Sequence, residues 1–412
     1  MQEIKRDLYL NKLINAIGNR MIKVVTGIRR SGKSYLLNNL FKNYLLESGV
    51  SADHIIILNM DERRNISYRD PDTLDEYIRS KIKDNEMYYV IIDEVQFVAD
   101  FESVLNGFLN MHNLDVYVSG SNSKFLSNDI ITEFRGRGQQ IRVYPLSFSE
   151  FMSVTTLSKS DALTEYLRYG GMPLLMSMKS DEAKARYLKD LFELTYLKDI
   201  IERNNVLRDD VLDELVNILA SAVGSLTSVT KLTNTFKSKG VKELSKNTLI
   251  QYLDYLLDSF LIEKVSRYDV KGKKYIQTLA KYYFSDIGLR NARLNFRQQE
   301  ENHIIENVVY NELIRRGFNV DVGIVEIRNG NGIKRLEVDF VCNEASRRYY
   351  IQVTTHLDTR EKTLQEQRPL LHIGDNFKKI IIVRDDIKPW YTEEGILVLG
   401  LYDFLLDNDS IL

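Results

Sequence analysis

The sequence has few of the residues that mark secreted, zinc-binding or disordered proteins. Its single cysteine, Cys342, excludes an internal disulfide and agrees with a reducing compartment. Five prolines and 21 glycines in 412 residues leave little room for a disordered tail. The five histidines form neither an HExxH motif nor a Cys–His spacing, and no GxSxG elbow occurs. A structural zinc site and a serine-hydrolase elbow are therefore not expected.

Long apolar runs and an excess of positive charge are also missing. No run approaches the ~20 residues that a membrane helix needs, and residues 88–92 and 380–383 have the length of buried strands. The first residues, MQEIKRDLYLNKL, are patterned as a helix rather than as a secretory signal. We therefore expect a cytoplasmic protein without membrane contact. A formal net charge of −2 excludes a uniformly basic nucleic-acid binder, although one face could be basic.

The first 150 residues alternate between short apolar runs and helical spacing, and the length of the whole chain predicts two to four domains. Strands are expected at residues 21–25, 54–60, 88–92 and 114–118. Because these runs are almost continuously apolar, they favour a parallel sheet that helices cover on both faces. The sequence therefore predicts an α/β domain over residues 1–150.

The pattern changes after Pro145. Residues 148–205 are helical with a break at GGMP, residues 170–173. Three helical stretches and two strand-like pieces follow within residues 209–285, an order typical of a winged helix. A helix at 304–316 and strands at 336–341, 349–354 and 379–383 then indicate a second α/β region. The predicted division is a helical lid at 151–207, a winged helix at 208–295 and an α/β domain at 296–412.

A phosphate-binding motif stands between the first strand and the next helix. Residues 27–34, GIRRSGKS, match GxxxxGK[ST] without exception. The glycines allow backbone N–H groups to turn toward phosphates, and the helix N-terminus favours the anion. Lys33 would reach the β- and γ-phosphates of ATP, and Ser34 would bind Mg²⁺, while Arg29 and Arg30 could instead face solvent or a neighbouring subunit. The predicted nucleotide-binding residues are Gly27, Arg29, Arg30, Ser31, Gly32, Lys33, Ser34 and Tyr35.

A second motif, YYVIIDE at residues 88–94, places two carboxylates after an apolar strand. Asp93 would hold Mg²⁺ through water, and Glu94 would orient or deprotonate the water that attacks the γ-phosphate. The simpler interpretation is a core strand that ends in a polar turn. The phosphate-binding loop sixty residues earlier (93 − 33) favours the catalytic interpretation.

Two further segments offer catalytic side chains. In SGSN, after the strand at 114–118, Ser121 and Asn122 could reach the γ-phosphate or the attacking water, or the segment could simply cap a helix. FRGRG supplies Arg137, and as second choice Arg135, as an arginine finger that stabilises charge on the transferred phosphoryl group. A solvated basic loop explains this segment equally well, and action within one subunit or across an interface stays open.

Several strings resemble one family. IKVVTGIRRSGKSYLL, VIIDEVQ, VSGSNSKFLS, EFRGRG and YPLSFSEF, in that order, resemble the ATPase module of AAA-superfamily proteins of bacteria and archaea that carry a C-terminal domain of unknown function. YGGMP, LKDIIERN and KYYFSDIGLRN are similar to the same family, so the resemblance covers nearly the whole chain. It implies an ATPase domain with ATP and Mg²⁺, a winged helix and a restriction-endonuclease-like domain.

The C-terminal α/β region carries candidates for a second site. Strand alternation places Glu337 and Asp339 on one face, and Gln352 and Thr354 share a face of the next strand. Together with Glu306 on the preceding helix, this order resembles the PD-(D/E)XK arrangement, in which carboxylates hold Mg²⁺ and a lysine supports the attacking water. The sequence has QVT at residues 352–354 where Glu-x-Lys is expected, and it identifies no substitute lysine. Binding to DNA or partner proteins is favoured over cleavage, and the candidate residues are Glu306, Asp339 and Gln352.

Three functional hypotheses remain. The favoured one is an ATP-hydrolysing machine that acts on DNA, compatible with a homo-oligomer. The alternatives are a slow nucleotide-dependent switch that binds partner proteins and a DNA nuclease that ATP gates. A basic neighbourhood around the predicted recognition helix, residues 246–257, supports DNA, although a solvated lysine face is equally compatible. Its lysines are Lys239, Lys242, Lys246, Lys271, Lys273 and Lys274.

Overall fold

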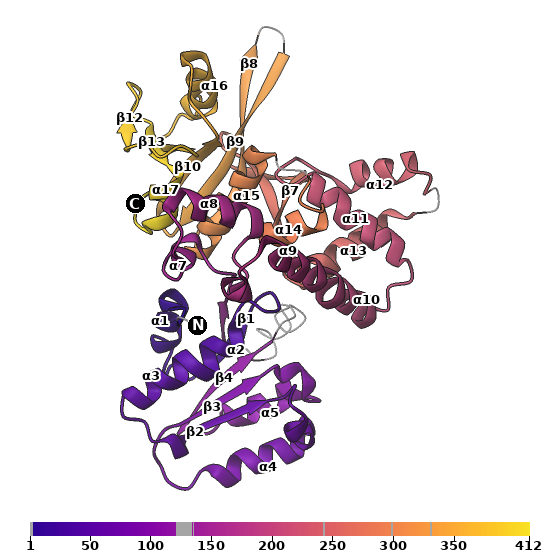
Figure 1. The fold of residues 1–412 in the computed structure, drawn as a ribbon, viewed down its shortest axis with the longest axis vertical. Helices are drawn as coiled ribbons and strands as arrows, with labels where there is room; N and C mark the ends of the chain where they lie inside the picture. The colour runs from indigo at the N-terminus through magenta and orange to yellow at the C-terminus, as the bar shows by residue number, and fades with distance from the viewer. Residues whose placement is uncertain (1–2, 121–133, 135, 242–243, 298–299, 330–331) are drawn as a thin grey trace. The chain divides into compact units, whose positions relative to one another are not determined.

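The protein consists of two compact units in the computed structural model, which describes residues 3–120, 134, 136–241, 244–297, 300–329 and 332–412 (Figure 1). Unit 1 comprises Met1–Pro145 with Asp258–Phe260. Unit 2 comprises Leu146–Leu257 and Leu261–Leu412. Among the described residues, no helix is both long and apolar enough to cross a membrane.

Unit 1 is built on a five-stranded sheet in the order β2-β3-β4-β1-β5, and every pairing in it is parallel. Its strands are β1 Ile22–Thr26, β2 Ile55–Asn59, β3 Tyr88–Asp93, β4 Leu114–Ser119 and β5 Gly138–Arg142. The four predicted strands are confirmed. The edge strand β5 was not predicted, because GQQIR is largely polar and only Ile141 is fully buried.

Helices cover both faces of this sheet, as the continuously apolar strands predict. On one face, α1 (Asp7–Ile14) and the helix that follows the phosphate loop bury Tyr9, Leu36 and Phe41 against the sheet. That helix runs through α2 Lys33–Tyr35, η1 Leu36–Phe41 and α3 Lys42–Glu47. On the other face lie α4 (Pro71–Lys81) and α5 (Phe101–Phe108). The remaining short turns are η2 Ala52–His54, η3 Arg63–Arg69 and η4 Val95–Phe97.

Unit 2 begins with a helical region whose predicted break is confirmed. Its helices are α7 Phe148–Met152, α8 Lys159–Tyr169, η6 Pro173–Ser177, α9 Asp181–Asp190, η7 Leu191–Leu197 and α10 Lys198–Asn204. Gly170 ends α8 with a φ of 74°, and a Cβ there would lie 2.3 Å from Oδ1 of Asp286. A side chain at this position would collide with that carboxylate, so the break needs glycine.

Three helices and a β-hairpin follow in the predicted order. They are α11 Asp209–Ser221, α12 Val229–Ser238, α13 Lys246–Asp258, β6 Ile262–Asp269 and β7 Lys274–Phe284. Thr227, between α11 and α12, forms an antiparallel bridge with Ala280 of β7. This bridge ties the helices to the hairpin. The hairpin is longer than the strand-like pieces in the sequence indicate, because polar residues interrupt its apolar pattern.

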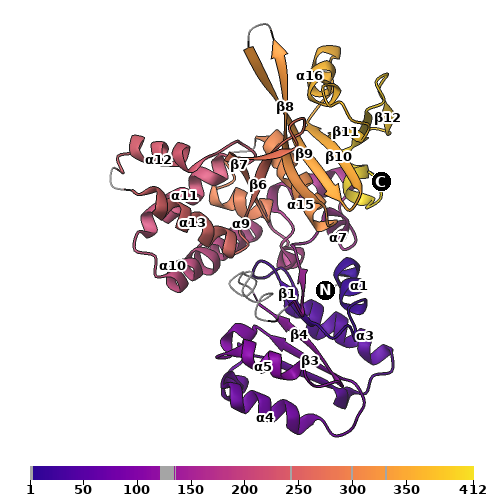
Figure 2. The ribbon, with the colours of Figure 1, turned by 180° about the vertical axis from the view of Figure 1, so that it is seen from behind.

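The C-terminal part extends the same hairpin into an eight-stranded sheet in the order β12-β13-β11-β10-β9-β8-β6-β7. Its remaining elements are α14 Ile287–Arg293, α15 Glu301–Arg315, β8 Asn319–Asn329, β9 Gly332–Glu344, β10 Arg347–Thr354, α16 Arg360–Leu371, β11 Lys378–Val383, β12 Trp390–Tyr391, β13 Leu397–Gly400 and α17 Leu401–Leu406. Strand β6 pairs in parallel with β8, so the hairpin and the C-terminal strands share one sheet. Figures 1 and 2 show α15 lying against the middle of this sheet.

Candidate active site

The candidate active site lies where parallel strands of unit 1 end. The phosphate loop follows β1, Asp93 ends β3 and Ser119 ends β4. The register pairs Val25 with Ser119 and Ile92 with Val118, so the three segments meet at the carboxyl edge of the sheet. Ligands of open α/β sheets bind at this edge.

The phosphate loop adopts a conformation that depends on glycine. Gly27 has a φ of 135°, and a Cβ there would lie 2.1 Å from the carbonyl oxygen of Val143. Gly32 and Arg30 also have positive φ, 98° and 64°. The loop encloses the Lys33 side chain, whose Nζ donates to the carbonyl oxygens of Gly27 (3.0 Å) and Ile28 (3.1 Å). These neutral partners can be exchanged for phosphate oxygens.

The buried Lys33 ammonium group has both negatively and positively charged neighbours. Burial lowers the pKa of its ammonium group to about 8, Glu94 and Asp93 act in the opposite direction, and Arg29 adds to the lowering. A cation with a lowered pKa gains from an incoming anion, because the anion stabilises the charged form. The electrostatics therefore suit a phosphate ligand at Lys33.

The two carboxylates after β3 are held by neighbouring side chains. Ser119 Oγ donates to the Asp93 carboxylate and accepts the Glu94 N–H at 3.1 Å. Burial raises the pKa of Asp93, against hydrogen bonds from Ser119 and Ser34. Glu94 has a φ of 53°, and its carboxylate accepts a hydrogen bond from Gln96 Nε2. The Ser34 hydroxyl and the Asp93 carboxylate are hard oxygen donors, so this pair fits Mg²⁺.

Three residues that support the site were not predicted from the sequence. Ser119 is the last residue of β4, and Gln96 lies two residues after Glu94. The guanidinium of buried Arg6 donates to the carbonyl oxygens of Ser31 (3.0 Å) and Tyr144 (2.6 Å). A serine at the strand end could have been noticed beside Ser121, whereas nothing local to Arg6 signals its contact with the phosphate loop.

The predicted nucleotide-binding residues lie together in the loop and the following turn. Lys33 and Ser31 are buried, Arg29 is half-buried, and the exposed members are Arg30, Ser34 and Tyr35. Ser34 nevertheless forms the hydrogen bond with Asp93. The predicted Asn122, Ser121 and Arg135 lie outside the described residues.

Arg137 lies at the opposite end of the strands, where their amino ends meet. It precedes β5, and its carbonyl oxygen accepts the N–H of Ile22, the first residue of β1. The phosphate loop follows the far end of β1, about 16 Å away at 3.3 Å per residue. The structure therefore does not bring Arg137 to the phosphate loop of the same chain.

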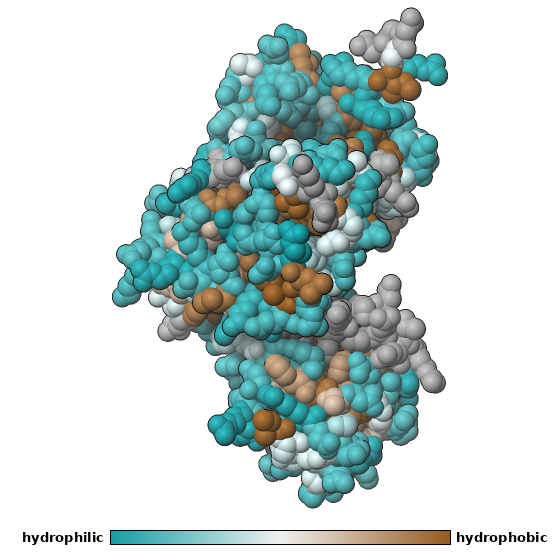
Figure 3. All heavy atoms as spheres, turned by 90° about the vertical axis from the view of Figure 1, so that its right-hand side faces the viewer, coloured by the Kyte–Doolittle hydropathy of each residue, from teal (hydrophilic) through white to brown (hydrophobic). Residues whose placement is uncertain are grey.

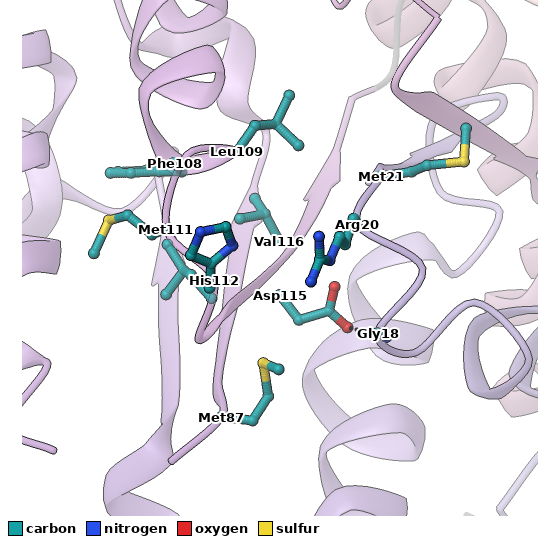
Figure 4. Close-up of a pocket in the computed structure, with 11 residues that line it drawn as sticks. Gly18, Arg20, Met21, Met87, Phe108, Leu109, Met111, His112, Asp115 and Val116 are labelled. Atoms are coloured by element: carbon teal, nitrogen blue, oxygen red, sulfur yellow. Dashed lines mark hydrogen bonds between the residues drawn. The ribbon is translucent and has the colours of Figure 1, made fainter. Parts of the chain in front are cut away.

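The amino edge of the sheet also contains a cavity of about 190 Å³ (Figure 4). Arg20, His112 and Asp115 surround it with several apolar side chains, among them Met21, Met87 and Met111. Asp115 forms a buried ion pair with Lys23 and accepts the hydroxyl of Tyr117. This cavity is remote from the phosphate loop because it lies at the opposite ends of the strands.

The predicted second site is a buried ion cluster in unit 2. The structure brings Glu306 of α15 together with Glu337 and Asp339 of β9, around the ammonium group of Lys281 from β7. Lys281 Nζ lies 2.7 Å from Glu306 Oε1, 2.7 Å from Glu337 Oε1 and 3.8 Å from Asp339 Oδ1. The sequence hint that was missed is a lone lysine in the apolar string AKYYF, residues 280–284.

Neighbouring groups complete this cluster. The Tyr283 hydroxyl donates to Glu306 Oε1 at 2.5 Å, and the Val353 N–H donates to Asp339 Oδ2 at 2.8 Å. Gln352 Oε1 lies 3.4 Å from the Asp339 N–H, which it accepts. Burial opposes the charge of the Lys281 ammonium group. The neighbouring carboxylates outweigh this effect and raise its pKa above the ordinary value; they belong to Glu306, Asp339 and Glu337. The ammonium group is therefore held in its charged form.

The sheet order and the carboxyl-edge site define the class of P-loop ATPases with an AAA-type sheet. Residues 19–152 match the family model of an AAA domain, and residues 160–300 match that of a domain of unknown function. An uncharacterized protein of Haemophilus influenzae is 34% identical over 410 residues, which cover 98% of each chain. The chain belongs to the family of this Haemophilus protein.

Two more distant proteins are also similar. An uncharacterized protein of Methanocaldococcus jannaschii is 28% identical over 350 residues, 82% of this chain and 74% of that protein. A solved structure of a Walker-type ATPase of Pyrococcus abyssi superposes with a TM-score of 0.50 at 16% identity, over 71% of this chain and 96% of that one. This likeness supports the fold of the chain.

Proposed function

We propose that this protein is a Mg²⁺-dependent ATPase that couples ATP binding and hydrolysis to conformational change on DNA. The observation that carries the ATPase part is the meeting of the phosphate loop with Asp93 and Glu94 at one sheet edge. A phosphate-binding cation, a magnesium-binding oxygen pair and a candidate base then lie within one site. This is the set of groups that phosphoryl transfer to water requires.

Each group has a distinct role in this proposal. The loop N–H groups and the Lys33 ammonium bind the β- and γ-phosphates, and Lys33 gives up its carbonyl partners to do so. Ser34 and Asp93 would hold Mg²⁺, which would supply positive charge to the phosphates. Glu94 accepts the proton of the attacking water, and Gln96 positions its carboxylate. The Ser119 hydroxyl holds the Asp93 carboxylate and the Glu94 backbone N–H in place through hydrogen bonds.

We assign Arg137 a role across an interface. Its place at the amino edge keeps it from the phosphate loop of its own chain, so an arginine finger here needs a neighbouring copy. The proposal therefore includes a homo-oligomer. Asn122 keeps its predicted role at the γ-phosphate, outside the described residues.

The DNA part of the proposal rests on unit 2. We interpret residues 208–295 as a winged helix, because three helices precede a hairpin and the Thr227–Ala280 bridge closes the group. The helical lid at 151–207 precedes it, and the α/β region at 296–412 follows. Exposed residues of α13 include Lys246, Asn247 and Gln251, and the two amides are suited to read base edges.

A basic surface adjoins this helix group. The turn of the β6–β7 hairpin carries three exposed lysines, and Lys271 Nζ donates to the carbonyl oxygen of Glu326 in β8. The β8–β9 hairpin adds further exposed cations. We call these residues the hairpin basic surface: Lys271, Lys273, Lys274, Arg328 and Lys334. Arg335 is also exposed but pairs with Glu326. Clustered cations of this kind suit a phosphate backbone. Lys239 does not contribute, because Glu214 pairs with it, and Lys242 lies outside the described residues.

The experiment that tests the proposal is the steady-state ATPase rate of the full chain with and without duplex, single-stranded and branched DNA. Lys33→Ala and Glu94→Gln serve as inactive variants, and Lys83→Ala, an exposed lysine of unit 1, serves as the matched control. Turnover that rises with one DNA form and disappears in both variants supports the proposal. An absence of turnover overturns the ATPase part, and turnover that ignores all DNA overturns the DNA part.

A switch that binds partner proteins is the second candidate. Two leucines of the helical lid region are unusually exposed for their type, Leu207 at 93% and Leu194 at 69%. Figure 3 looks onto the side of unit 2 that carries α10 to α13 and shows separate apolar patches on a mainly hydrophilic surface. Slow turnover with no DNA response, together with a nucleotide-dependent complex size, would favour this function. Leu207→Ser would then weaken the complex.

A further inference from the structure

The ion cluster in unit 2 has the carboxylates of a nuclease-like metal site, but a lysine stands among them. Carboxylates that bind Mg²⁺ or Ca²⁺ converge on one point about 2.0–2.6 Å from each ligand oxygen. In this cluster the point of convergence is Lys281 Nζ, 2.7 Å from one oxygen of Glu306 and 2.7 Å from one of Glu337. Lys281 is 2% exposed, so its ammonium group is enclosed by the cluster.

Two oxygens of the inner carboxylates also accept hydrogen bonds from other donors. Oε1 of Glu306 accepts Tyr283 Oη as well as Lys281. Oδ2 of Asp339 accepts the Val353 N–H. A divalent cation that binds these two oxygens would displace these donors as well as the ammonium group, and each displaced donor would be left buried without a partner.

Strand β10 supplies neither of the groups that a nuclease needs there. Gln352 points its carbonyl oxygen at the Asp339 N–H, and Thr354 Oγ1 donates to the carbonyl oxygen of His356. Lys281 comes from β7 and is bound by carboxylates, so it is not free to support an attacking water. The residues present therefore do not fit a divalent metal.

We propose that the Lys281 ammonium takes the place of the divalent cation, so that this cluster binds no metal and cleaves no DNA. Its role is to attach the β6–β7 hairpin to α15 and β9. Burial raises the pKa of Asp339, but Glu306 and Glu337 still oppose the single ammonium group with two carboxylates, so removal of the lysine would create a cation site. This inference is independent of the ATPase proposal.

The test is Mn²⁺ binding to the full chain without nucleotide, followed by electron paramagnetic resonance. The variants are Lys281→Gln, Asp339→Asn and the double variant, and Lys274→Gln is the matched control because it is an exposed lysine of the same strand. We expect the Mn²⁺ stoichiometry of the wild-type chain to be unchanged by Asp339→Asn and by Lys274→Gln. Lys281→Gln is expected to bind one additional Mn²⁺, which the double variant loses.

Two results would overturn the proposal. One is a wild-type Mn²⁺ site that disappears in Asp339→Asn, and the other is a folded Lys281→Gln variant that gains no site. If Lys281→Gln does not fold, plasmid nicking decides: the wild-type chain with Mn²⁺ should leave supercoiled DNA intact. Nicking by the wild-type chain that Asp339→Asn abolishes would show a working metal site instead.

Discussion

Lys33 of unit 1 and Lys281 of unit 2 show how the same buried side chain can serve different purposes. Lys33 is 4% exposed and Lys281 is 2% exposed, so burial does not distinguish them. Lys33 Nζ donates to backbone carbonyl oxygens, whereas Lys281 Nζ is bound by carboxylates. Accordingly the pKa of Lys33 is lowered and that of Lys281 is raised.

The difference determines what each lysine can bind. An ammonium group whose hydrogen-bond partners are neutral, as at Lys33, is only partly compensated by nearby carboxylates, and an anionic ligand relieves the remaining cost of burial. An ammonium group enclosed by carboxylates is already compensated and attracts no anion. Lys33 is therefore suited to a phosphate, and Lys281 is suited to structural support.

The largest expected effect tests the ligand-binding lysine. Lys33→Ala should lower ATP turnover by about 10²–10³-fold and weaken ATP binding, because it removes a preorganised positive charge from the phosphates. Glu94→Gln should lower turnover to a similar extent but retain ATP binding. The steady-state rate and the Kd for ATP are measured for both variants, with Lys83→Ala as the control. A Lys33→Ala variant that keeps wild-type turnover would contradict the assignment of the site.

The second effect tests the structural lysine. Lys281→Met should destabilise unit 2 by about 3–5 kcal/mol, because Glu306 is left as a buried charge without its partner. Nucleotide affinity in unit 1 should stay unchanged. Chemical denaturation and ATP titration measure the two, and Lys274→Met is the control. A loss below about 1 kcal/mol, the value of an exposed pair, would mean that the cluster is solvated.

The third effect is the pH dependence of ATP binding. Without nucleotide the pKa of Lys33 is about 8, and a bound phosphate raises it because the anion stabilises the ammonium form. Below pH 8 the group is already charged, so it adds no pH dependence there. Above that pH, binding takes up a proton, and affinity should fall by up to about tenfold per pH unit. The Kd of a fluorescent ATP analogue measures this, and Lys33→Gln should show no such fall.

The smallest effect concerns lysines that are neither buried nor compensated. Replacing Lys273 and Lys274 by glutamine should reduce the slope of log K against log salt for duplex DNA by about 2, since each phosphate contact contributes about 0.9. Fluorescence anisotropy at several salt concentrations measures the slope. Lys179→Gln, an exposed lysine of the helical lid region, is the control. An unchanged slope would remove the hairpin turn from the DNA interface.

Much of the fold could be predicted because its signals are local. Apolar runs located β1 to β4, and helical spacing located α15. Strands β5 and β8 were missed, because β5 is polar and edge-exposed and β8 contains a glycine and charged residues. The elements that pack against β8 decide which of its residues are buried, because burial in a strand depends on tertiary packing.

The sequence by itself located the candidate nucleotide site, because the phosphate loop and the strand that ends in Asp93 and Glu94 are contiguous motifs with local geometry. Only the tertiary structure decided which side chains complete each site. Arg6 reaches the phosphate loop, and Lys281 fills the carboxylate cluster, through contacts between segments distant in sequence. Strand pairing and helix packing create such contacts, and no short-range sequence pattern predicts them. Strand pairing also decided the position of Arg137. The parallel register of β5 with β1 puts this residue at the amino ends of the strands.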